Sequence, residues 1–269
     1  MTTPRTVFAV DVTATMISLS LLKETTDGSA SVPIKKLLPV PTNGDTVFTP
    51  RKTWDRASRV VDDAAATILG NGVPTLVVMA KQQWADLGRD QSAGRRLELH
   101  ALLADRLHAA AVPVAEFPYP TLLTWLTSGE TPRRRMGTTR AKPSVMADIA
   151  AEVERLWGVK QPTYTSKETS REIAYPFRRQ VLALAALGGM AVGVETSVAV
   201  TAARLELMQG KGNASIQWPT ERVPPGDLTK WHMLHDNAAA LEPLDLVGEA
   251  EREARRERLR AKRAAAAGV

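Results

Sequence analysis

Short apolar runs dominate the first forty residues and predict extended strands. Residues 6–12 and 16–23 are rich in Val, Ile and Leu and are separated by a small polar turn. A third strand is predicted within residues 31–40, after another polar turn. One carboxylate, Asp11, lies inside the first apolar run. A strand with this pattern is expected to be buried, so its single charged residue needs an explanation.

The pattern changes to a helical period after residue 50. Val61, Ala64, Ala65 and Ile68 define the apolar face of a helix predicted over residues 53–70. The Val-rich runs at 75–80 and 112–117 are typical of buried parallel strands. Further helices are predicted over residues 92–110, 120–129, 143–158, 175–192 and 195–210.

This order of elements predicts an α/β fold. The expected sheet is mixed, with a three-strand antiparallel meander followed by parallel strands, and helices flank it. Beyond residue 210 the sequence becomes rich in Pro and Trp ("QWPTERVPPGDLTKWH"), and the end is charged and rich in alanine. We therefore expect a domain over residues 1–210, an irregular arm over 211–248 and a charged Ala/Arg-rich tail over 249–269.

Basic charge is concentrated in two segments of the chain. The net charge is +6, and residues 130–142 and 249–263 carry +4 and +3 of it, so the rest is close to neutral. The first segment is predicted to be a loop with five basic residues: Arg133, Arg134, Arg135, Arg140 and Lys142. Such a cluster suits a polyanion, most often nucleic acid. A solvated loop without a ligand is the alternative.

Several classes of protein are disfavoured by the sequence. Cysteine is absent, which excludes disulfides and thiolate metal sites. The N-terminus does not resemble a secretion signal, and no apolar run reaches the ~18 residues of a membrane span, so we expect a cytoplasmic protein without a membrane partner. His232 and His235 have a spacing that can bind zinc, but no third ligand is evident nearby, and a packed or solvated pair is the simpler interpretation.

Five segments in order resemble the RuvC-like Holliday junction resolvases of the RNase H-like superfamily. The resemblance spans roughly residues 6–192, and no single segment is specific by itself. The segments are "FAVDVTATMISLSLL", "VPTLVVMAKQQW", "AAAVPVAEFPYPTLLTWLTSG", "TTRAKPSVMADIAAEV" and "RRQVLALAALGG". The resemblance implies an RNase H-like fold, binding of DNA that can be branched, a homodimer and magnesium as the cofactor of an active enzyme. A bacteriophage origin would fit so divergent a copy.

The catalytic carboxylates that the resemblance implies are mostly missing. The family uses two divalent ions about 4 Å apart, held by carboxylates from distant parts of the chain. Asp11 matches the first carboxylate. The second is expected near Ala80, but no acid occurs there, and the next residue is the cation Lys81. At the last helix Phe177 and Gln180 stand where aspartates are expected, with Arg178 and Arg179 between them.

We therefore interpret Asp11 as the remnant of a catalytic site. An ion pair with Lys81 or Arg178 can take the place of the metal, because an opposite charge stabilises a buried carboxylate. Lys81, Arg178 and Arg179 join the five basic loop residues as candidate nucleic-acid contacts. The alternative is a rebuilt metal site, with Asp11 and acids drawn from Asp148, Glu168, Glu172 and Glu195.

Three functions remain open from the sequence. The first is a DNA-binding protein with a degenerate nuclease centre; we expect it to be a homodimer, as the resemblance implies, and to need no cofactor. The second is an active structure-specific endonuclease that uses magnesium. The third is an assembly protein that uses the fold as a scaffold.

Overall fold

The structure is a computed structural model of the chain. It describes residues 4–27, 34–39, 49–70, 72–82, 92–127, 145–161, 163–165, 170–174, 178–210 and 215–237. The chain divides into two compact units, residues 1–238 and 239–269, and all described residues belong to the first. None of the described helices combines the length and the apolar character that a membrane crossing needs.

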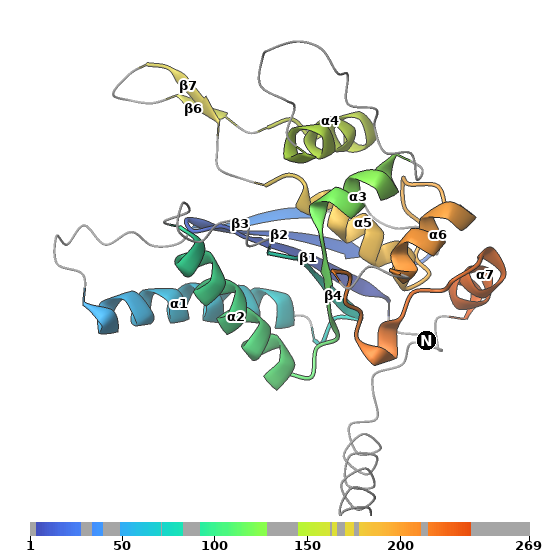
Figure 1. Cartoon of the computed structure of the whole chain (residues 1–269), viewed down its shortest axis with the longest axis horizontal. Helices are drawn as coiled ribbons and strands as arrows, with labels where there is room; N and C mark the ends of the chain where they lie inside the picture. The colour runs from blue at the N-terminus through green and yellow to red at the C-terminus, as the bar shows by residue number, and fades with distance from the viewer. Residues whose placement is uncertain are drawn as a thin grey trace, which may run out of the picture. The chain divides into compact units, whose positions relative to one another are not determined.

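A five-stranded mixed sheet forms the centre of this unit (Figure 1). The strands are β1 (Thr6–Val12), β2 (Met16–Lys23), β3 (Ile34–Pro39), β4 (Leu76–Ala80) and β5 (Val114–Phe117). Their order is β3-β2-β1-β4-β5. The first three pair antiparallel, and β1–β4 and β4–β5 pair parallel. The predicted mixed sheet is confirmed, with Asp11 on its central strand.

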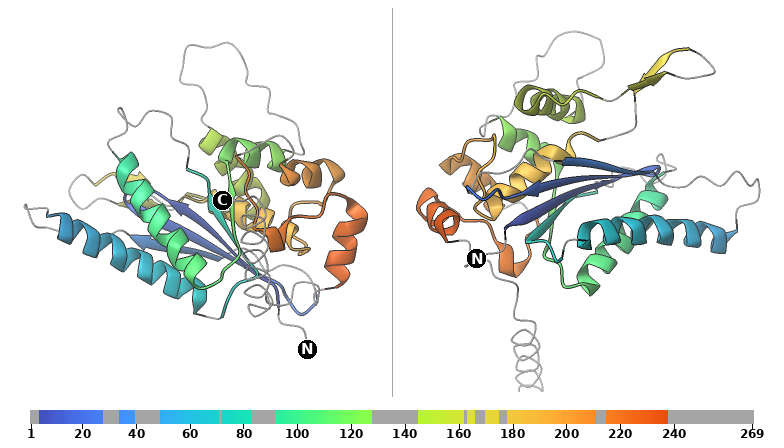
Figure 2. Two further views of the ribbon diagram at one scale, coloured as in Figure 1. Left: turned by 60° about the horizontal axis from the view of Figure 1, so that its bottom comes forward. Right: turned by 180° about the vertical axis from the view of Figure 1, so that it is seen from behind.

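Helices cover both faces of the sheet, which explains why β1 is apolar along almost its whole length. On one face, α1 (Pro50–Leu69) and α2 (Ala93–Ala109) pack over a core that includes Phe8 and Val10 (Figures 1 and 2). On the other face, α5 (Val181–Ala191) packs against β1, β2 and β4, and every one of its residues is buried.

The close approach of α5 to the sheet depends on Gly188. A methyl group at Gly188 would lie 2.6 Å from Val7 Cγ1 and 2.8 Å from Val78 Cγ2. We predict that Gly188→Ala lowers the free energy of unfolding by about 1–3 kcal/mol, because the core would be overpacked. Urea denaturation checks this, with Gly94→Ala as the control, since a methyl group there has no atom within 4 Å. Equal stability of the two variants would contradict the prediction.

The remaining helices follow the prediction with shifted starts. They are α3 (Tyr119–Leu126), α4 (Val145–Trp157) and α6 (Ala202–Gln209). The helix expected from residue 195 begins only at Ala202, because the Thr201 side chain accepts a hydrogen bond from the Arg204 N–H and caps it. The helix expected over residues 175–192 is α5, which begins only at Val181. The small hairpin β6 (Thr163–Thr165) and β7 (Glu172–Ala174) was not predicted.

The expected irregular arm contains regular structure. A 3-10 turn, η1 (Thr220–Arg222), precedes the helix α7 (Leu228–Asp236), which begins at the capping residue Asp227. Trp231 of α7 is buried and donates a hydrogen bond from Nε1 to Met190 O at 2.9 Å. Gln217 pairs with Glu116 of β5 through two backbone hydrogen bonds. The described part of the arm is therefore packed onto the sheet domain.

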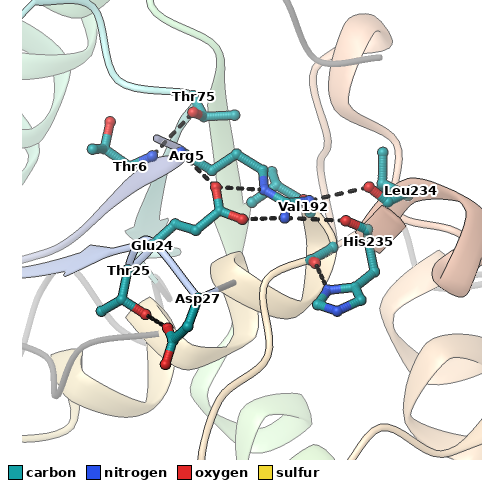
Figure 3. A network of polar contacts seen from close by, with 10 residues as sticks. Arg5, Thr6, Glu24, Thr25, Asp27, Thr75, Val192, Leu234 and His235 are labelled. Carbon is teal, nitrogen blue, oxygen red and sulfur yellow. Dashed lines mark hydrogen bonds and ion pairs between the residues drawn. The ribbon is translucent and has the colours of Figure 1, made fainter. Parts of the chain in front are cut away.

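A buried arginine at the start of β1 joins three parts of the chain (Figure 3). Arg5 is 3% exposed and forms a two-pronged ion pair with Glu24, at the end of β2. The same guanidinium donates to the carbonyls of Val192, Leu234 and His235, which follow α5 and lie in α7. This network holds α7 at the end of the sheet where β1 begins.

The two histidines of the zinc-like pair have different surroundings. His235 stacks on Trp231 with ring centroids 5.0 Å apart, and its Nδ1 lies 2.9 Å from Gly193 O. His232 contacts the edge of Trp231. His232 is exposed and His235 is partly buried, in agreement with the packed or solvated pair expected from the sequence.

Candidate functional site

Asp11 lies near the end of β1, on the face that α5 covers. Val7 contacts α5, and residues two apart on a strand share a face, so Asp11 points to the same side. The register that pairs Val10 with Met79 places Ala80 beside Asp11 on the neighbouring strand. We call the end of the sheet where β1, β4 and β5 finish the Asp11 end.

Arg178 is the cation that approaches Asp11. Its Nε lies 3.8 Å from Asp11 Oδ2, and its backbone N–H donates to the hydroxyl of Ser18, the residue opposite Asp11 on β2. The Arg178 side chain is 40% exposed, whereas that of Asp11 is 6% exposed. Of the two partners suggested by the sequence, the structure brings Arg178 and not Lys81 to the carboxylate.

Burial dominates the electrostatics of Asp11. Desolvation raises the pKa of its carboxyl group, and the Arg178 guanidinium, the Tyr119 hydroxyl, His100 and Arg96 offset this only in part. Tyr119 lies at the start of α3, and burial raises its own pKa well above the ordinary value. Neither Asp11 Oδ2 nor the Tyr119 hydroxyl oxygen forms a geometrically sound hydrogen bond with a described residue. The site is thus a desolvated acid that pairs with Arg178 and lies within the electrostatic reach of Arg96.

A second polar cluster lies beside the ends of β4 and β5. Glu116 Oε2 is 3.6 Å from Lys81 Nζ, and Glu116 Oε1 is 3.5 Å from His100 Nε2. With its side-chain amide turned to suit both neighbours, Gln217 accepts from Lys81 at 3.1 Å and donates to Glu116 at 3.3 Å. Glu116 pairs with Met79, which belongs to the core under α1 and α2, so it lies on the opposite face from Asp11.

Sequence reasoning missed Glu116 and the part that His100 plays beside it. Burial lowers the pKa of His100, and the charge of Lys81 acts in the same direction, against the opposite effects of Glu116 and Asp11. His100 is therefore neutral near pH 7. Two signals were present: a lone carboxylate in the apolar strand "VAEF", and a histidine on the leucine face of α2.

The residues that the structure describes around Asp11 do not fit a pair of magnesium ions. Such a pair needs several converging carboxylates. Among the described residues, no group of three or more His, Asp or Glu side chains could hold a metal. Glu172 is exposed in β7, where it bonds to Thr163, and Glu195 is exposed after α5. Asp148 lies on α4, and Glu168 is outside the described residues.

Arg179 has a structural partner. Its guanidinium donates to Glu154 at 2.9 Å and to Val159 O at 3.0 Å, which joins the start of α5 to the end of α4. Gln180 Nε2 donates to Met146 O at 2.7 Å, in the first turn of α4. The basic segment predicted to be a loop precedes α4 in the sequence. Its residues Arg133, Arg134, Arg135, Arg140 and Lys142 lie outside the described residues.

Comparisons with known proteins give similarities of fold only at low identity. The sequence matches no protein-family model and no curated protein. Among solved structures, the RuvC of Thermus thermophilus is 12% identical, covers 79% of this chain and 99% of its own, and has a TM-score of 0.44. The same protein in complex with a Holliday junction substrate is 14% identical, with the same coverage and a TM-score of 0.46. The yeast mitochondrial Holliday junction resolvase Ydc2 is 15% identical over 45% of this chain and 56% of its own, with a TM-score of 0.33.

Proposed function

We propose that this chain is a RuvC-like nucleic-acid-binding protein, for branched or duplex DNA, whose nuclease centre is degenerate. The observation that carries the proposal is the pairing of Asp11 with Arg178. The sequence resemblance places a catalytic aspartate at Asp11 and further acids at the start of the last helix. At those positions the chain has Phe177 and Gln180, and Arg178, which lies between them, has its Nε 3.8 Å from the Asp11 carboxylate.

The arginine beside Asp11 changes which ligands the site can bind. A guanidinium beside a carboxylate competes with a divalent ion for the same oxygens, and it also supplies the positive charge that a phosphate needs. The Arg178 side chain is 40% exposed, so its guanidinium can contact a ligand at the surface while it stays close to Asp11. Lys81 lies on the opposite face at the same end of the sheet, where it is 22% exposed and paired with Glu116, so Arg178 is the cation that serves the Asp11 site.

The two other functions differ in simple observables. An active endonuclease, the first alternative, requires carboxylates to converge on Asp11 after a rearrangement. An assembly protein, the second alternative, requires no affinity for DNA. A homodimer fits both the DNA-binding protein and the endonuclease, because a four-way junction has two-fold symmetry.

The test measures binding and cleavage of a four-way junction and of duplex DNA, with EDTA and with magnesium. We expect binding in EDTA, with an affinity that falls steeply as salt rises, and no cleavage in magnesium. The Arg178→Ala variant should bind more weakly in EDTA, because a phosphate contact is lost. Magnesium-dependent cleavage that disappears in Asp11→Asn would overturn the proposal in favour of the endonuclease. Absence of binding at low salt would favour the assembly protein.

A further inference from the structure

The β6–β7 hairpin stands apart from the other described elements. Its strands pair antiparallel, with Thr163 opposite Ala174 and Thr165 opposite Glu172. The hairpin does not join the five-stranded sheet, and its strands pack chiefly against each other. Figure 1 and the right view of Figure 2 show it projecting beyond α4. A lone two-stranded hairpin is at best marginally stable in water, so a partner outside the chain would stabilise it.

The base of the hairpin is fixed beside Arg178. The next residue, Arg179, donates to Val159 O at 3.0 Å and to Glu154 at 2.9 Å. It thereby holds the chain before β6 against the chain after β7. The strand β6 starts four residues after Val159, and β7 ends four residues before Arg178, a stretch that spans at most about 14 Å. The hairpin therefore projects from the neighbourhood of the Asp11 site.

The helix that precedes the hairpin is itself tied to the start of α5. In the first turn of α4, Met146 O accepts a hydrogen bond from Gln180 Nε2 at 2.7 Å. At the other end of α4, Arg179 contacts Glu154 and Val159. The helix also packs against α3. The hairpin thus extends from a base on regular elements, which is what a contact element needs if it is to meet a ligand that Arg178 also binds.

The charge and polarity of the hairpin suit nucleic acid. Residues 159–178 contain four Lys or Arg and two Glu, so their net charge is +2 within a chain of +6. The exposed side chains that the structure describes in this segment are polar: Lys160, Thr163, Thr165, Ser170, Arg171 and Glu172. Arg, Lys, Ser and Thr are among the side chains that contact phosphates, and Glu172 is engaged with Thr163. None of the large apolar side chains described as exposed lies here, which disfavours a protein partner.

We propose that the β6–β7 hairpin contacts one duplex arm of DNA whose backbone also meets Arg178. This inference rests on the proposed DNA binding and names the element that holds an arm outside the Asp11 site. Neighbouring strands lie about 4.8 Å apart, so a two-stranded hairpin fits in a major groove about 12 Å wide. Lys160 and Arg171, which precede the two strands and are exposed, bind phosphates beside that groove.

The first experiment uses the absence of cysteine from the chain. A Thr165→Cys variant, changed at an exposed position of β6, carries a tethered iron–EDTA group, which cuts DNA close to its point of attachment once ascorbate is added. The matched control is Met233→Cys with the same label, since Met233 is 66% exposed on α7, at the end of the sheet where β1 begins. Each labelled full-length protein is bound to a four-way junction and to duplex DNA. Thermal unfolding verifies that both variants fold.

A second measurement removes the two cations of the hairpin. Binding of Lys160→Ala/Arg171→Ala to duplex DNA is titrated over a range of salt concentrations in EDTA. The expected loss is about 0.9 units of the log–log salt slope for each phosphate contact, hence about 2 units in all. The matched control is Arg106→Ala/Lys230→Ala, with the same change of charge in the last turn of α2 and in α7.

The outcomes separate the inference from the proposed function. Localised cuts from the label at residue 165 and not at residue 233, with a slope reduced only in the hairpin variant, support the inference. Equal cutting from both labels, or no cutting from residue 165 while DNA is bound, overturns the inference and leaves the proposed function standing. An unchanged slope in the hairpin variant, or equal losses in both charge variants, also overturns it. Failure of the wild type to bind DNA would overturn the proposed function itself.

Discussion

Arg5→Ala is expected to lower the free energy of unfolding by about 3–5 kcal/mol at pH 7, the largest effect that we predict. The substitution leaves the carboxylate of Glu24, with a side chain only 10% exposed, without its cation. It also removes the donor from the carbonyls of Val192, Leu234 and His235. A buried charge and buried carbonyls without partners are among the most costly defects in a core.

The same ion pair sets a pH dependence with a definite sign. Burial alone would raise the pKa of Glu24, but the hydrogen bonds and the charge of Arg5 outweigh it and lower that pKa. The stabilisation by the pair is therefore present above the unfolded pKa of Glu24, near 4.3, and is lost as pH falls through the lower folded value. The cost of Arg5→Ala should shrink in acid.

Urea denaturation at pH 7 and in acid measures both effects. Arg51→Ala is the control, because its ion pair with Asp55 is exposed and should contribute less than about 1 kcal/mol. In the double variant Arg5→Ala/Glu24→Ala the loss should be smaller than the sum of the two single losses. A cost for Arg5→Ala no larger than that for Arg51→Ala would contradict the role of the network.

The sheet and its main helices could be predicted because their apolar patterns are strong. The strand β4 is a continuous apolar run, and β1 and β2 are apolar at most positions; strands of this kind are buried on both faces of a covered sheet. The hairpin β6–β7 could not be found in this way, since Thr163, Thr165 and Glu172 are exposed and give no apolar pattern. The helix α7 was missed because it is held by contacts with residues distant in sequence: Trp231 donates to Met190 O, and Arg5 donates to Leu234 O and His235 O.

In the candidate site, too, the sequence predicts what a local pattern marks and misses what packing of distant segments brings together. Asp11 could be found because one carboxylate interrupts an apolar strand. Glu116 and His100 are 16 positions apart in the sequence, and only the packing of α2 over β5 brings them together. Sequence could not choose between Lys81 and Arg178 as the partner of Asp11. The strand pairing decides it, because Lys81 is drawn to Glu116 on the other face.

Asp11→Asn is expected to raise the free energy of unfolding at pH 7, by about 1.4 kcal/mol for each unit by which folding raises the pKa of Asp11. The ionised carboxylate is disfavoured by burial more than the half-exposed Arg178 restores it, so a neutral residue of the same shape is better tolerated in the folded chain. The physical reason is desolvation, which raises the pKa of Asp11 above its unfolded value despite Arg178, Tyr119, His100 and Arg96. The folded chain thus holds this proton more tightly than the unfolded chain does.

The sign of the pH effect follows from that difference. Below the unfolded pKa, near 3.9, Asp11 is protonated in both states and the substitution should change little. As pH rises through the interval up to the higher folded pKa, the wild type loses stability relative to Asp11→Asn, and the difference is complete above it. Chemical denaturation of both proteins across this range checks the prediction. A loss of stability in Asp11→Asn at pH 7 would contradict it.

A double-mutant cycle with Arg178 connects this stability effect to the proposed function. Arg178→Ala alone should destabilise by about 1–2 kcal/mol at pH 7, because Asp11 keeps its burial and loses its cation. In the Asp11→Asn background the same change should cost little, since no charge remains to be compensated. Binding of DNA should behave differently from stability, because Arg178 serves the phosphate whether or not residue 11 is charged. Arg178→Ala is therefore expected to weaken binding in both backgrounds, and a loss of binding confined to the Asp11 background would show that Arg178 acts only on Asp11.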